Sequence, residues 1–447
     1  MIWSIGACAI SLLLKFYKEK SSQQVMLLIF VFFIWLGASV SLFLDVSWGD
    51  LSSTLIPSLS FLTVWLLILC YLTMAWSLFK SRQNLTFWVT LVLFMIYGSI
   101  WSQEYFSFYT WFELGVIPIL LLILFGSSSS TRLEAGLFLF FFTIVSALFL
   151  FFLLFSITMC GDTSMSSSFT NFFVETSSFF NESVLLAVCA MLAFLVKFPL
   201  FVLHVWLPKA HVEAPVMGSM ILAGLLLKLG GLGFLVFKKI IILDMSSWVF
   251  LFSSFCLYSS FTVGLICFQQ NDSKILVAFS SVNHMSLTIF SMLCSSSFSL
   301  IASFCILIGH GLASSLLFFL VSMPYSVSGN KGLMSQSKTF SSVNFLSIML
   351  LGILMNLGFP PFLNFLGEIL VLTHLWHFPY LALMFFLNFF VGALYSFKLL
   401  SQLIQKKKNY FSFWPFFSSS SSNVLQGLIG WGHLLPFLFF LNFALFF

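Results

Sequence analysis

Four charged residues interrupt stretches of sequence that are otherwise apolar: Glu113, Lys197, Lys228 and Glu368. An ionisable side chain inside a membrane costs about 2.5–3.5 kcal/mol on insertion scales, so such residues usually pair, face a wet cavity or serve transport. Two carboxylates and two ammonium groups carry no net charge, which favours mutual pairing. A static ion pair that only specifies helix packing is the alternative. Four such groups, together with nearby histidines and helix breaks, favour a proton path.

Three histidines lie within or beside these apolar stretches, and histidine exchanges protons near neutral pH. His310 lies in the middle of its stretch, and His284 follows a short polar run. His204 comes seven residues after Lys197, which predicts one shared face of a continuous helix. A buried histidine that is simply hydrogen-bonded is the alternative for each. We take His284 and His310 as candidate members of the path, and His204 as a candidate for a polar axis beside it.

Prolines and glycines interrupt two of the apolar stretches next to these charges. Pro199 follows Lys197 by two residues, and Gly358, Pro360 and Pro361 come shortly before Glu368. Proline removes a backbone donor, and the freed polar groups are tolerated at membrane depth only where protein or water satisfies them. Paired interruptions in the two halves of a transporter indicate its ion path. The two breaks lie five predicted spans apart, as repeats of five spans each would require.

The composition requires a lipid environment for the elements that hold these residues. Of the 447 residues, 60% are hydrophobic and only 7% are charged, whereas a soluble domain carries about 25% charged residues. The sequence therefore predicts an all-α polytopic membrane protein with about fourteen transmembrane helices in a single membrane domain, residues 1–447. The predicted spans are 1–14, 25–44, 55–79, 87–101, 106–124, 133–157, 184–207, 216–237, 248–268, 275–294, 300–322, 345–372, 380–400 and 424–447.

The charges of the predicted loops orient these spans. With the N-terminus outside, most loop Lys and Arg residues fall on the inner side, as the positive-inside rule requires. Lys209, Glu213 and Lys274 are counted among the charges of the inner loops. Lys398 lies near the end of its span, where its side chain is expected to reach the lipid headgroups.

No sequence pattern indicates redox or nucleotide chemistry on this chain. It has no Gly-rich nucleotide loop and no His/Cys cluster at metal-ligand spacing, and its eight cysteines form no CxxC pair. Gly230, Gly231 and Gly233 follow no strand, so we interpret them as helix-packing residues. We expect no cofactor and no metal on this chain, no nucleic acid among its partners, and contacts with membrane lipids.

Several motifs together resemble a known family. They are LHVWLPKAHVEAP at 203–215, GSM at 218–220, LLLKLGG at 225–231, FELGVIP at 112–118, AFSSVNHM at 278–285, GHGLASS at 309–315, and PP at 360–361 with LGE at 366–368. In these motifs the chain closely resembles the chain 4 family of NADH:ubiquinone oxidoreductase, respiratory complex I, which is related to multisubunit cation/proton antiporters. The resemblance runs from about residue 85 to 400.

The resemblance implies a specific architecture. Three N-terminal helices (1–84) would precede two inverted five-helix repeats (85–240 and 245–402), and a last helix (423–447) would follow. The seventh and twelfth helices would be discontinuous.

The resemblance also implies a role for each candidate residue. Glu113 and Lys197 would form a switchable ion pair, Lys228 would be the central proton carrier, and Glu368 would be the terminal exchange group. His284 and His310 would lie on a hydrated axis between Lys228 and Glu368. The sister chains 2 and 5 usually carry lysine at the Glu368 position, which favours chain 4. Asn283 replaces a commoner serine, a change of little expected effect because both side chains bind water.

The implied partners are the neighbouring antiporter-like chains 2 and 5 and accessory subunits, with FMN, iron–sulfur clusters and ubiquinone held by partner subunits. The short loops and the absence of a targeting segment favour the mitochondrial inner membrane, and a bacterial plasma membrane is the alternative. A subunit of a multisubunit cation/proton antiporter is the main rival function, and a purely structural membrane anchor is a third.

Overall fold

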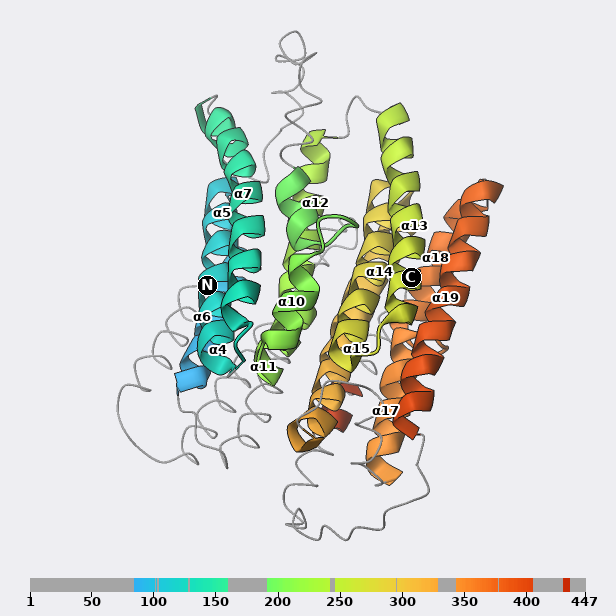
Figure 1. Ribbon diagram of the computed structural model, residues 1–447. Helices are drawn as coiled ribbons and strands as arrows, with labels where there is room; N and C mark the ends of the chain where they lie inside the picture. The colour runs from blue at the N-terminus through green and yellow to red at the C-terminus, as the bar shows by residue number, and fades with distance from the viewer. Residues whose placement is uncertain are drawn as a thin grey trace, which may run out of the picture.

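The computed structural model describes residues 84–100, 102, 104–127, 129–159, 191–241, 246–294, 296–328, 343–376, 378–404 and 429–434, and its elements over these residues are all helices (Figure 1). Seven helical segments of the described residues are long and apolar enough to cross a membrane. Over the described residues the chain therefore has the helical, membrane-spanning architecture that was predicted. The predicted spans 1–14, 25–44 and 55–79 lie outside the described residues, and 184–207 and 424–447 are described only in part.

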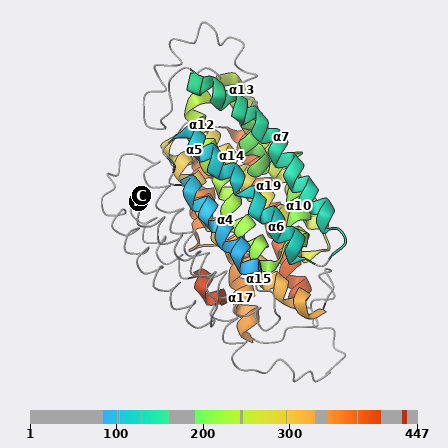
Figure 2. The same ribbon diagram turned by 90° about the vertical axis from the view of Figure 1, so that its left-hand side faces the viewer.

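The helices run roughly side by side in three groups. One edge holds α4 (Asn84–Ile100), α5 (Tyr105–Leu114), α6 (Val116–Gly126) and α7 (Arg132–Met159). The middle holds α10 (Trp206–Glu213), α11 (Val216–Ile221), the π-helix η3 (Leu222–Leu226) and α12 (Leu227–Ile241), followed by α13 (Ser246–Gln269), α14 (Ser273–Leu293) and α15 (Ser297–Ser328). At the other edge lie α17 (Val343–Asn356), α18 (Leu363–Leu375) and α19 (Pro379–Ile404). Figure 2 views the bundle from the α4–α7 edge.

Buried polar side chains lie within the apolar core of this bundle, and large apolar side chains also cover its outside, where a soluble protein would be polar. The central helix α15 is wholly buried over its most apolar 18-residue window, whereas only 28% of the corresponding window of α19 is buried. Central α14 nevertheless carries many buried polar residues: Ser280, Ser281, Asn283, His284, Ser286, Thr288 and Ser291. The outer faces of α7 and α19 are rich in phenylalanine, Phe152 and Phe390 among them. This distribution suits lipid as the surrounding solvent.

The hydroxyl groups of α14 are satisfied within their own helix. Ser280 Oγ donates to the carbonyl of Val277 at 2.8 Å, and Ser286 Oγ donates to that of Asn283 at 2.7 Å. Such bonds to the preceding turn let serine sit in an apolar bundle without an unpaired donor. Two polar groups on α14 keep buried atoms without a hydrogen-bond partner among the described residues: the amide oxygen of Asn283 and the imidazole of His284.

The two predicted helix breaks are present. Residues 191–197 are helical, residues 198–205 form turns apart from Leu200, and a new helix starts at Trp206. The second break separates α17 from α18 and contains Gly358, which has a φ of 66°. The segment after the first break differs from the prediction, because residues 206–213 form helix α10 rather than a loop.

Glycines bring the helices close together where the candidate residues lie. A Cβ atom on Gly230 would lie 2.9 Å from the backbone nitrogen of Phe198, and one on Gly233 would overlap the ring of Phe194. Helix α12 therefore passes directly against the first break because these positions lack side chains. The interpretation of this glycine cluster as a packing motif is confirmed.

Candidate proton-transfer residues

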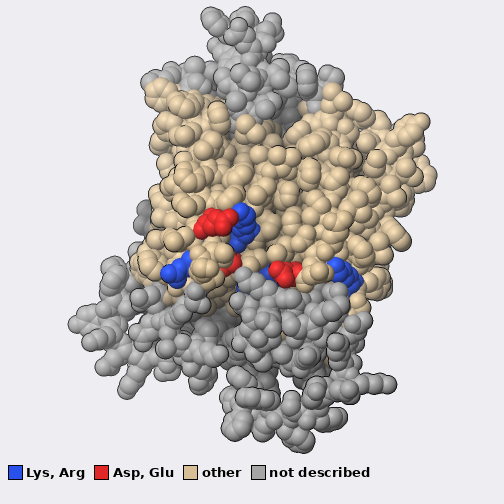
Figure 3. All heavy atoms as spheres, viewed as in Figure 1, with Lys and Arg blue, Asp and Glu red and all other residues tan. Residues whose placement is uncertain are grey.

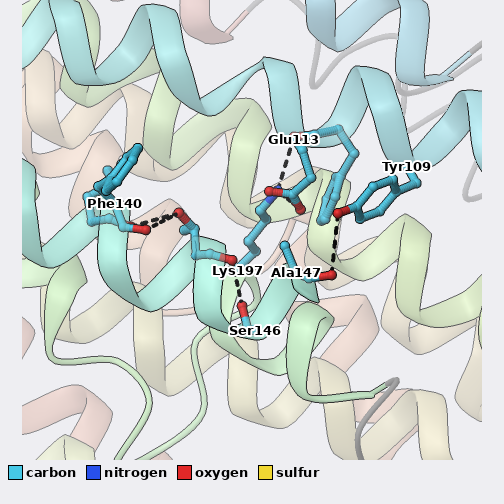
Figure 4. A network of polar contacts seen from close by, with 9 residues as sticks. Tyr109, Glu113, Phe140, Ser146, Ala147 and Lys197 are labelled. Atoms are coloured by element: carbon cyan, nitrogen blue, oxygen red, sulfur yellow. Dashed lines mark hydrogen bonds and ion pairs between the residues drawn. The ribbon is translucent and has the colours of Figure 1, made fainter. Parts of the chain in front are cut away.

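Glu113 and Lys197 form a buried ion pair (Figure 4). Lys197 Nζ lies 2.7 Å from Glu113 Oε1, and it also donates to the carbonyl of Phe112 at 3.0 Å. The ammonium lies 3.4 Å from the centroid of the Phe112 ring. The side chain of Lys197 is 5% exposed and that of Glu113 is 18% exposed. The structure thus brings together the first carboxylate and the first lysine, and the lysine is the more deeply buried partner.

The break at Pro199 places Lys197 at a helix end. Proline has no N–H, so the helix cannot continue with regular hydrogen bonds beyond this point. The indole Nε1 of Trp206 donates to the carbonyl of Val196 at 2.9 Å, which satisfies one of the acceptors near the break. Val202, in the turns that follow, has a φ of 77°. A β-branched residue in the left-handed region is strained, so this connection is held in shape by its surroundings.

Lys228 is the most deeply buried charge-bearing residue of the candidate set. Its side chain is fully buried, and its Nζ donates to the carbonyl of Ala223 at 2.6 Å. Ala223 belongs to the π-helix η3, whose wider turn supplies this carbonyl. Lys228 forms no ion pair with any residue that the structure describes. It interacts electrostatically with His211, His284 and His310, so it lies at the centre of the titratable groups.

A row of two imidazoles and one carboxylate lies beyond Lys228. The ring centroids of His284 and His310 are 5.0 Å apart, and His284 Nδ1 lies 3.8 Å from Glu368 Oε1. All three side chains are buried. The 3.8 Å separation exceeds hydrogen-bond length, so a bridging water or a small rotation is needed before a proton can cross.

Small residues fix the position of Glu368 against helix α15. A Cβ atom on Gly309, the neighbour of His310, would overlap the amide of Asn364, and one on Gly367 would lie 3.0 Å from the carbonyl oxygen of Ala302. Helices α15 and α18 therefore approach closely at both glycines. This contact holds the carboxylate-bearing helix next to the histidine-bearing one.

The second helix break borders the carboxylate directly. A Cβ atom on Gly358 would lie 2.6 Å from Glu368 Oε2. Asn364 Nδ2 donates to the carbonyl of Met355 at 2.8 Å, which satisfies an acceptor that the end of α17 leaves free. The break thus makes room for the Glu368 side chain, while Asn364 ties the two half-helices together.

Replacing Gly358 by alanine is expected to displace the Glu368 carboxylate. The new methyl group would occupy the carboxylate's place, and an L residue in the left-handed region costs about 1–2 kcal/mol. We expect a lower thermal midpoint of the assembled protein and impaired proton transfer at Glu368. The control is Gly115→Ala, because Gly115 has an ordinary helical φ and its nearest neighbour would lie 3.6 Å from the added Cβ. Equal midpoints for the two variants would contradict this packing.

The buried imidazoles have unsatisfied hydrogen-bonding capacity. Neither ring nitrogen of His284 or of His310 has a hydrogen-bond partner among the described residues. Buried polar atoms are almost always paired with protein or ordered water. Water between these rings would satisfy them, and it would also bridge the gaps that the protein leaves along the row.

His204 does not share a helical face with Lys197, so that prediction is wrong. The helix ends at Lys197, and His204 lies in the turns after Pro199. Its ring stacks on Phe201 with a centroid distance of 5.6 Å and meets Phe279 edge-on at 5.6 Å. The assumption of a continuous helix failed because the proline break resets the periodicity.

His211 is a buried titratable residue that sequence reasoning did not single out. It is fully buried and stacks on Phe318 at a centroid distance of 4.3 Å. It interacts electrostatically with Lys228 and with Lys274, so it lies between the centre of the row and the first turn of α14. The only sequence signal that could have marked His211 as a candidate site residue was its position in the LHVWLPKAHVEAP motif.

Two residues that were counted as loop charges are buried in the structure. Glu213 accepts hydrogen bonds from the hydroxyls of Ser129 and Thr131, and Lys274 donates to the carbonyl of Val212 at 3.3 Å. Glu213 was assigned to a loop because α10 was not predicted as a helix, and Lys274 because α14 begins two residues before the predicted span. The charges that remain visible on the surface gather in a band near one end of the bundle (Figure 3).

Lys398 binds two backbone carbonyls near the end of its helix. Its Nζ donates to the carbonyls of Phe268 and Gln270, at 2.6 and 2.8 Å. These carbonyls lie at the C-terminal end of α13, where a cation complements the helix dipole. That this side chain also reaches the lipid headgroups stays a prediction.

The described residues contain no group of three or more His, Cys, Asp or Glu side chains that could hold a metal ion. The described cysteines, Cys256, Cys267, Cys294 and Cys305, are free thiols. The arrangement as a whole can accept, hold and release protons along a buried row.

Comparison with known proteins defines the class that this fold and site belong to. Residues 102–394 match the family described as "NADH:quinone oxidoreductase/Mrp antiporter, TM". The fold is similar to that of a chain of respiratory complex I from Thermus thermophilus, with a TM-score of 0.78 and 18% identity over 97% of this chain and 94% of that one. The protein is therefore a member of the antiporter-like membrane proteins.

The sequence relatives narrow this class. The chain is 37% identical over 341 residues to NADH-ubiquinone oxidoreductase chain 4 of Locusta migratoria, which covers 75% of each protein. It is 30% identical over 440 residues to that of Rhipicephalus sanguineus, which covers 98% of this chain and 96% of the relative. The chain belongs to the NADH-ubiquinone oxidoreductase chain 4 family.

Proposed function

We propose that this chain is a proton-translocating subunit of a respiratory NADH:ubiquinone oxidoreductase. The observation that carries the proposal is the buried row of titratable groups that runs from Lys228 past His310 and His284 to Glu368, with the Glu113–Lys197 ion pair on the other side of the bundle. Static packing would not need so many ionisable side chains in a lipid-exposed bundle, because each one is costly to bury.

Lys197 is the switch in this proposal. Its ion pair with Glu113 closes across 2.7 Å, and its side chain lies at the end of a helix, directly before the break. Opening the pair would remove the influence of a neighbouring anion on Lys228 and lower the affinity of Lys228 for its proton. A change of about 1.4 kcal/mol in the interaction of the pair with Lys228 would change proton binding by Lys228 tenfold.

The proton released by Lys228 would pass through the two imidazoles to Glu368. Each neutral imidazole accepts a proton at one nitrogen and releases one from the other, so it can relay without net change. Bridging water would close the 3.8 Å gap between His284 Nδ1 and Glu368 Oε1. Glu368 would then pass the proton on as the terminal exchange group of this chain. His211 would connect Lys228 to the end of the bundle at Lys274.

The wider arrangement that we propose follows from family membership. The chain would have fourteen transmembrane helices, with two inverted five-helix repeats at 85–240 and 245–402. It would lie in the mitochondrial inner membrane beside the antiporter-like chains 2 and 5. FMN, iron–sulfur clusters and ubiquinone would bind to other subunits, whose electron transfer would drive the movement of protons through this one.

The rival function is that of a subunit of a cation/proton antiporter without a redox partner, since the matched family includes both kinds of protein. The identity of 37% to a chain 4 relative favours the respiratory complex. Purification under mild conditions discriminates the two: we expect the chain to co-purify with an assembly that contains flavin and iron–sulfur clusters. Isolation with antiporter subunits alone would overturn the proposal.

Replacing Glu368 by glutamine tests the row at its far end. Glutamine keeps the size of the side chain but cannot exchange a proton, so we expect the number of protons pumped per electron to fall. The ratio would be measured in the assembled complex reconstituted into sealed vesicles, with NADH oxidation followed in parallel. Glu134→Gln is the matched control, because Glu134 forms a 59% exposed ion pair with Lys209 at the surface. A wild-type ratio in Glu368→Gln would contradict the assignment.

A further inference from the structure

A small cavity lies at the Glu368 end of the histidine row, where residues of α14, of the second helix break and of α19 line it. Its volume is about 20 Å³, measured as the space open to the centres of water molecules. That is room for one or two waters. Its polar lining consists of Asn283, His284, Asn356, Glu368, Asn388 and Tyr395.

The cavity collects oxygen atoms that lack hydrogen-bond partners. Asn283 Oδ1, Asn356 Oδ1, Asn388 Oδ1 and Glu368 Oε2 are all buried and have no partner among the described residues. Each of these residues is at most 7% exposed. Four unsatisfied oxygens around one cavity amount to several kcal/mol if they stay dry, at about 1–3 kcal/mol each. Water with two donor hydrogens is the group that would satisfy them.

Helix α19 contributes one continuous face to this cavity. Asn388, Gly392 and Tyr395 are spaced by four and three residues, so they lie in a line along the helix. The opposite face of α19 is apolar and exposed, with Phe386, Phe390 and Phe397 among its residues. Asn388 and Tyr395 are buried on an outer helix of the described bundle, where their polar groups need hydrogen-bond partners. Water in the cavity would supply these partners.

Two glycines keep the space around these side chains open. A Cβ atom on Gly264 of α13 would lie 3.5 Å from Asn283 Nδ2 and 3.6 Å from Asn388 Oδ1, so both amides reach the same point. At Gly392 the nearest neighbour of an added Cβ would be the hydroxyl of Tyr395, 3.8 Å away. A larger side chain at Gly264 would press on the amides of Asn283 and Asn388, and one at Gly392 would take up space next to the Tyr395 hydroxyl.

Tyr395 connects the cavity to the end of the helix. It interacts with Asn283 and Glu368 on one side and with Cys267 on the other, and Cys267 interacts in turn with Lys398. Lys398 lies one helical turn after Tyr395 and binds the carbonyls of Phe268 and Gln270 at the end of α13. The distance along α19 from Asn388 to Lys398 is about 15 Å, at about 1.5 Å per residue.

We propose that this cavity holds water, and that Asn388 and Tyr395 with that water form a second branch of the proton path, from Glu368 along α19 to the end of the helix at Lys398. The inference rests on the proposed function, because it gives the proton on Glu368 a route to the surface. In each step an oxygen receives one proton as it passes on another: the cavity water takes the proton from Glu368, Tyr395 takes one from that water, and solvent water at the end of α19 takes the last proton from the Tyr395 hydroxyl. Lys398, which donates to two carbonyls there, marks this end and is not itself an acceptor. No charge therefore accumulates on Tyr395 or on the cavity water. The amides of Asn283 and Asn388 orient the water and are not themselves protonated.

Filling the cavity tests the branch. Gly392→Val adds an isopropyl group to the cavity wall, and we expect it to lower the number of protons pumped per electron to the value of a Lys228→Met variant. The measurement uses the assembled complex in sealed vesicles. Gly136→Val is the matched control, because Gly136 also lies in an outer helix and an added Cβ there would meet only leucine side chains, at 3.5 Å or more. Its ratio should equal that of the wild type.

Three further substitutions, at Tyr395 and Asn388, keep the test decisive if the valine variant does not assemble. Tyr395→Phe removes one hydroxyl and no packing, and Asn388→Leu keeps the size of the side chain without its hydrogen bonds. Both should lower the ratio, whereas Asn388→Ser, which can still hold water, should restore part of it. Wild-type ratios in Tyr395→Phe and Asn388→Leu, with a lowered ratio in Lys228→Met, would overturn this branch and leave the proposed function standing. A wild-type ratio in Lys228→Met would instead overturn the proposed function itself.

Discussion

Replacing Lys228 by methionine is expected to abolish coupled proton pumping. Methionine matches the length and shape of the lysine side chain but has no exchangeable proton. Lys228 is fully buried and interacts electrostatically with both His284 and His310, so no other described lysine can take its place. The fold should survive, because the substitution removes a buried charge and only one hydrogen bond, that to Ala223. Such a bond contributes about 1.5–3 kcal/mol when its donor is charged.

The proton-to-electron ratio of the reconstituted complex measures this effect. Lys209→Met is the control, since Lys209 is a 39% exposed partner in a surface ion pair with Glu134. An exposed pair of this kind contributes about 0–1 kcal/mol, and the control should therefore pump as the wild type does. Unchanged stoichiometry in Lys228→Met would remove Lys228 from the path.

Breaking the Glu113–Lys197 pair is expected to destabilise the protein, and more so when the carboxylate is the group removed. Glu113→Leu leaves an ammonium that is 5% exposed without its counter-ion, and Lys197→Met leaves a carboxylate that is 18% exposed. Removing one partner of a buried pair costs about 3–5 kcal/mol, because the other charge stays buried and unpaired. The thermal midpoint of the assembled complex should therefore fall furthest in Glu113→Leu.

The double variant Glu113→Leu/Lys197→Met separates stability from function. An apolar pair of similar volume avoids the unpaired charge, so the double variant should be more stable than Glu113→Leu alone. It should still fail to pump, because the switch is gone. A double variant that is less stable than both single variants would show that the two charges do not act as a pair, since the losses would simply add.

The class of fold and the ion pair could be predicted from the sequence for one physical reason: a charge in lipid is too costly to leave alone. Long apolar runs predicted helices that the structure contains, and the prolines beside Lys197 and Glu368 marked breaks that the structure also contains. Because the buried charges balance, a carboxylate and a lysine were expected to meet. The family resemblance implied that the partners are Glu113 and Lys197, and these two residues do meet. Apart from the choice of partners, these inferences depend on local sequence and on a count of charges.

Features that depend on contacts between helices could not be predicted in this way. The approach of His284 on α14 to His310 on α15 is set by packing, since nothing within either helix specifies the neighbour. The π-helix that supplies the Ala223 carbonyl has no distinct sequence signal. His204 was misplaced because a periodicity argument was carried across the proline break, and Glu213 was taken for a loop charge because α10 is short and polar.

The central claim is that Lys228, His310, His284 and Glu368 form one conducting row, and a map of internal water tests it most directly. The measurement is a density map of the assembled complex at a resolution that shows ordered water throughout the membrane part. We predict water within hydrogen-bond distance, about 2.7–3.2 Å, of the unpaired ring nitrogens of His284 and His310, and between His284 and Glu368. A map that resolves water elsewhere in this subunit but shows the row dry from Lys228 to Glu368 would contradict the claim.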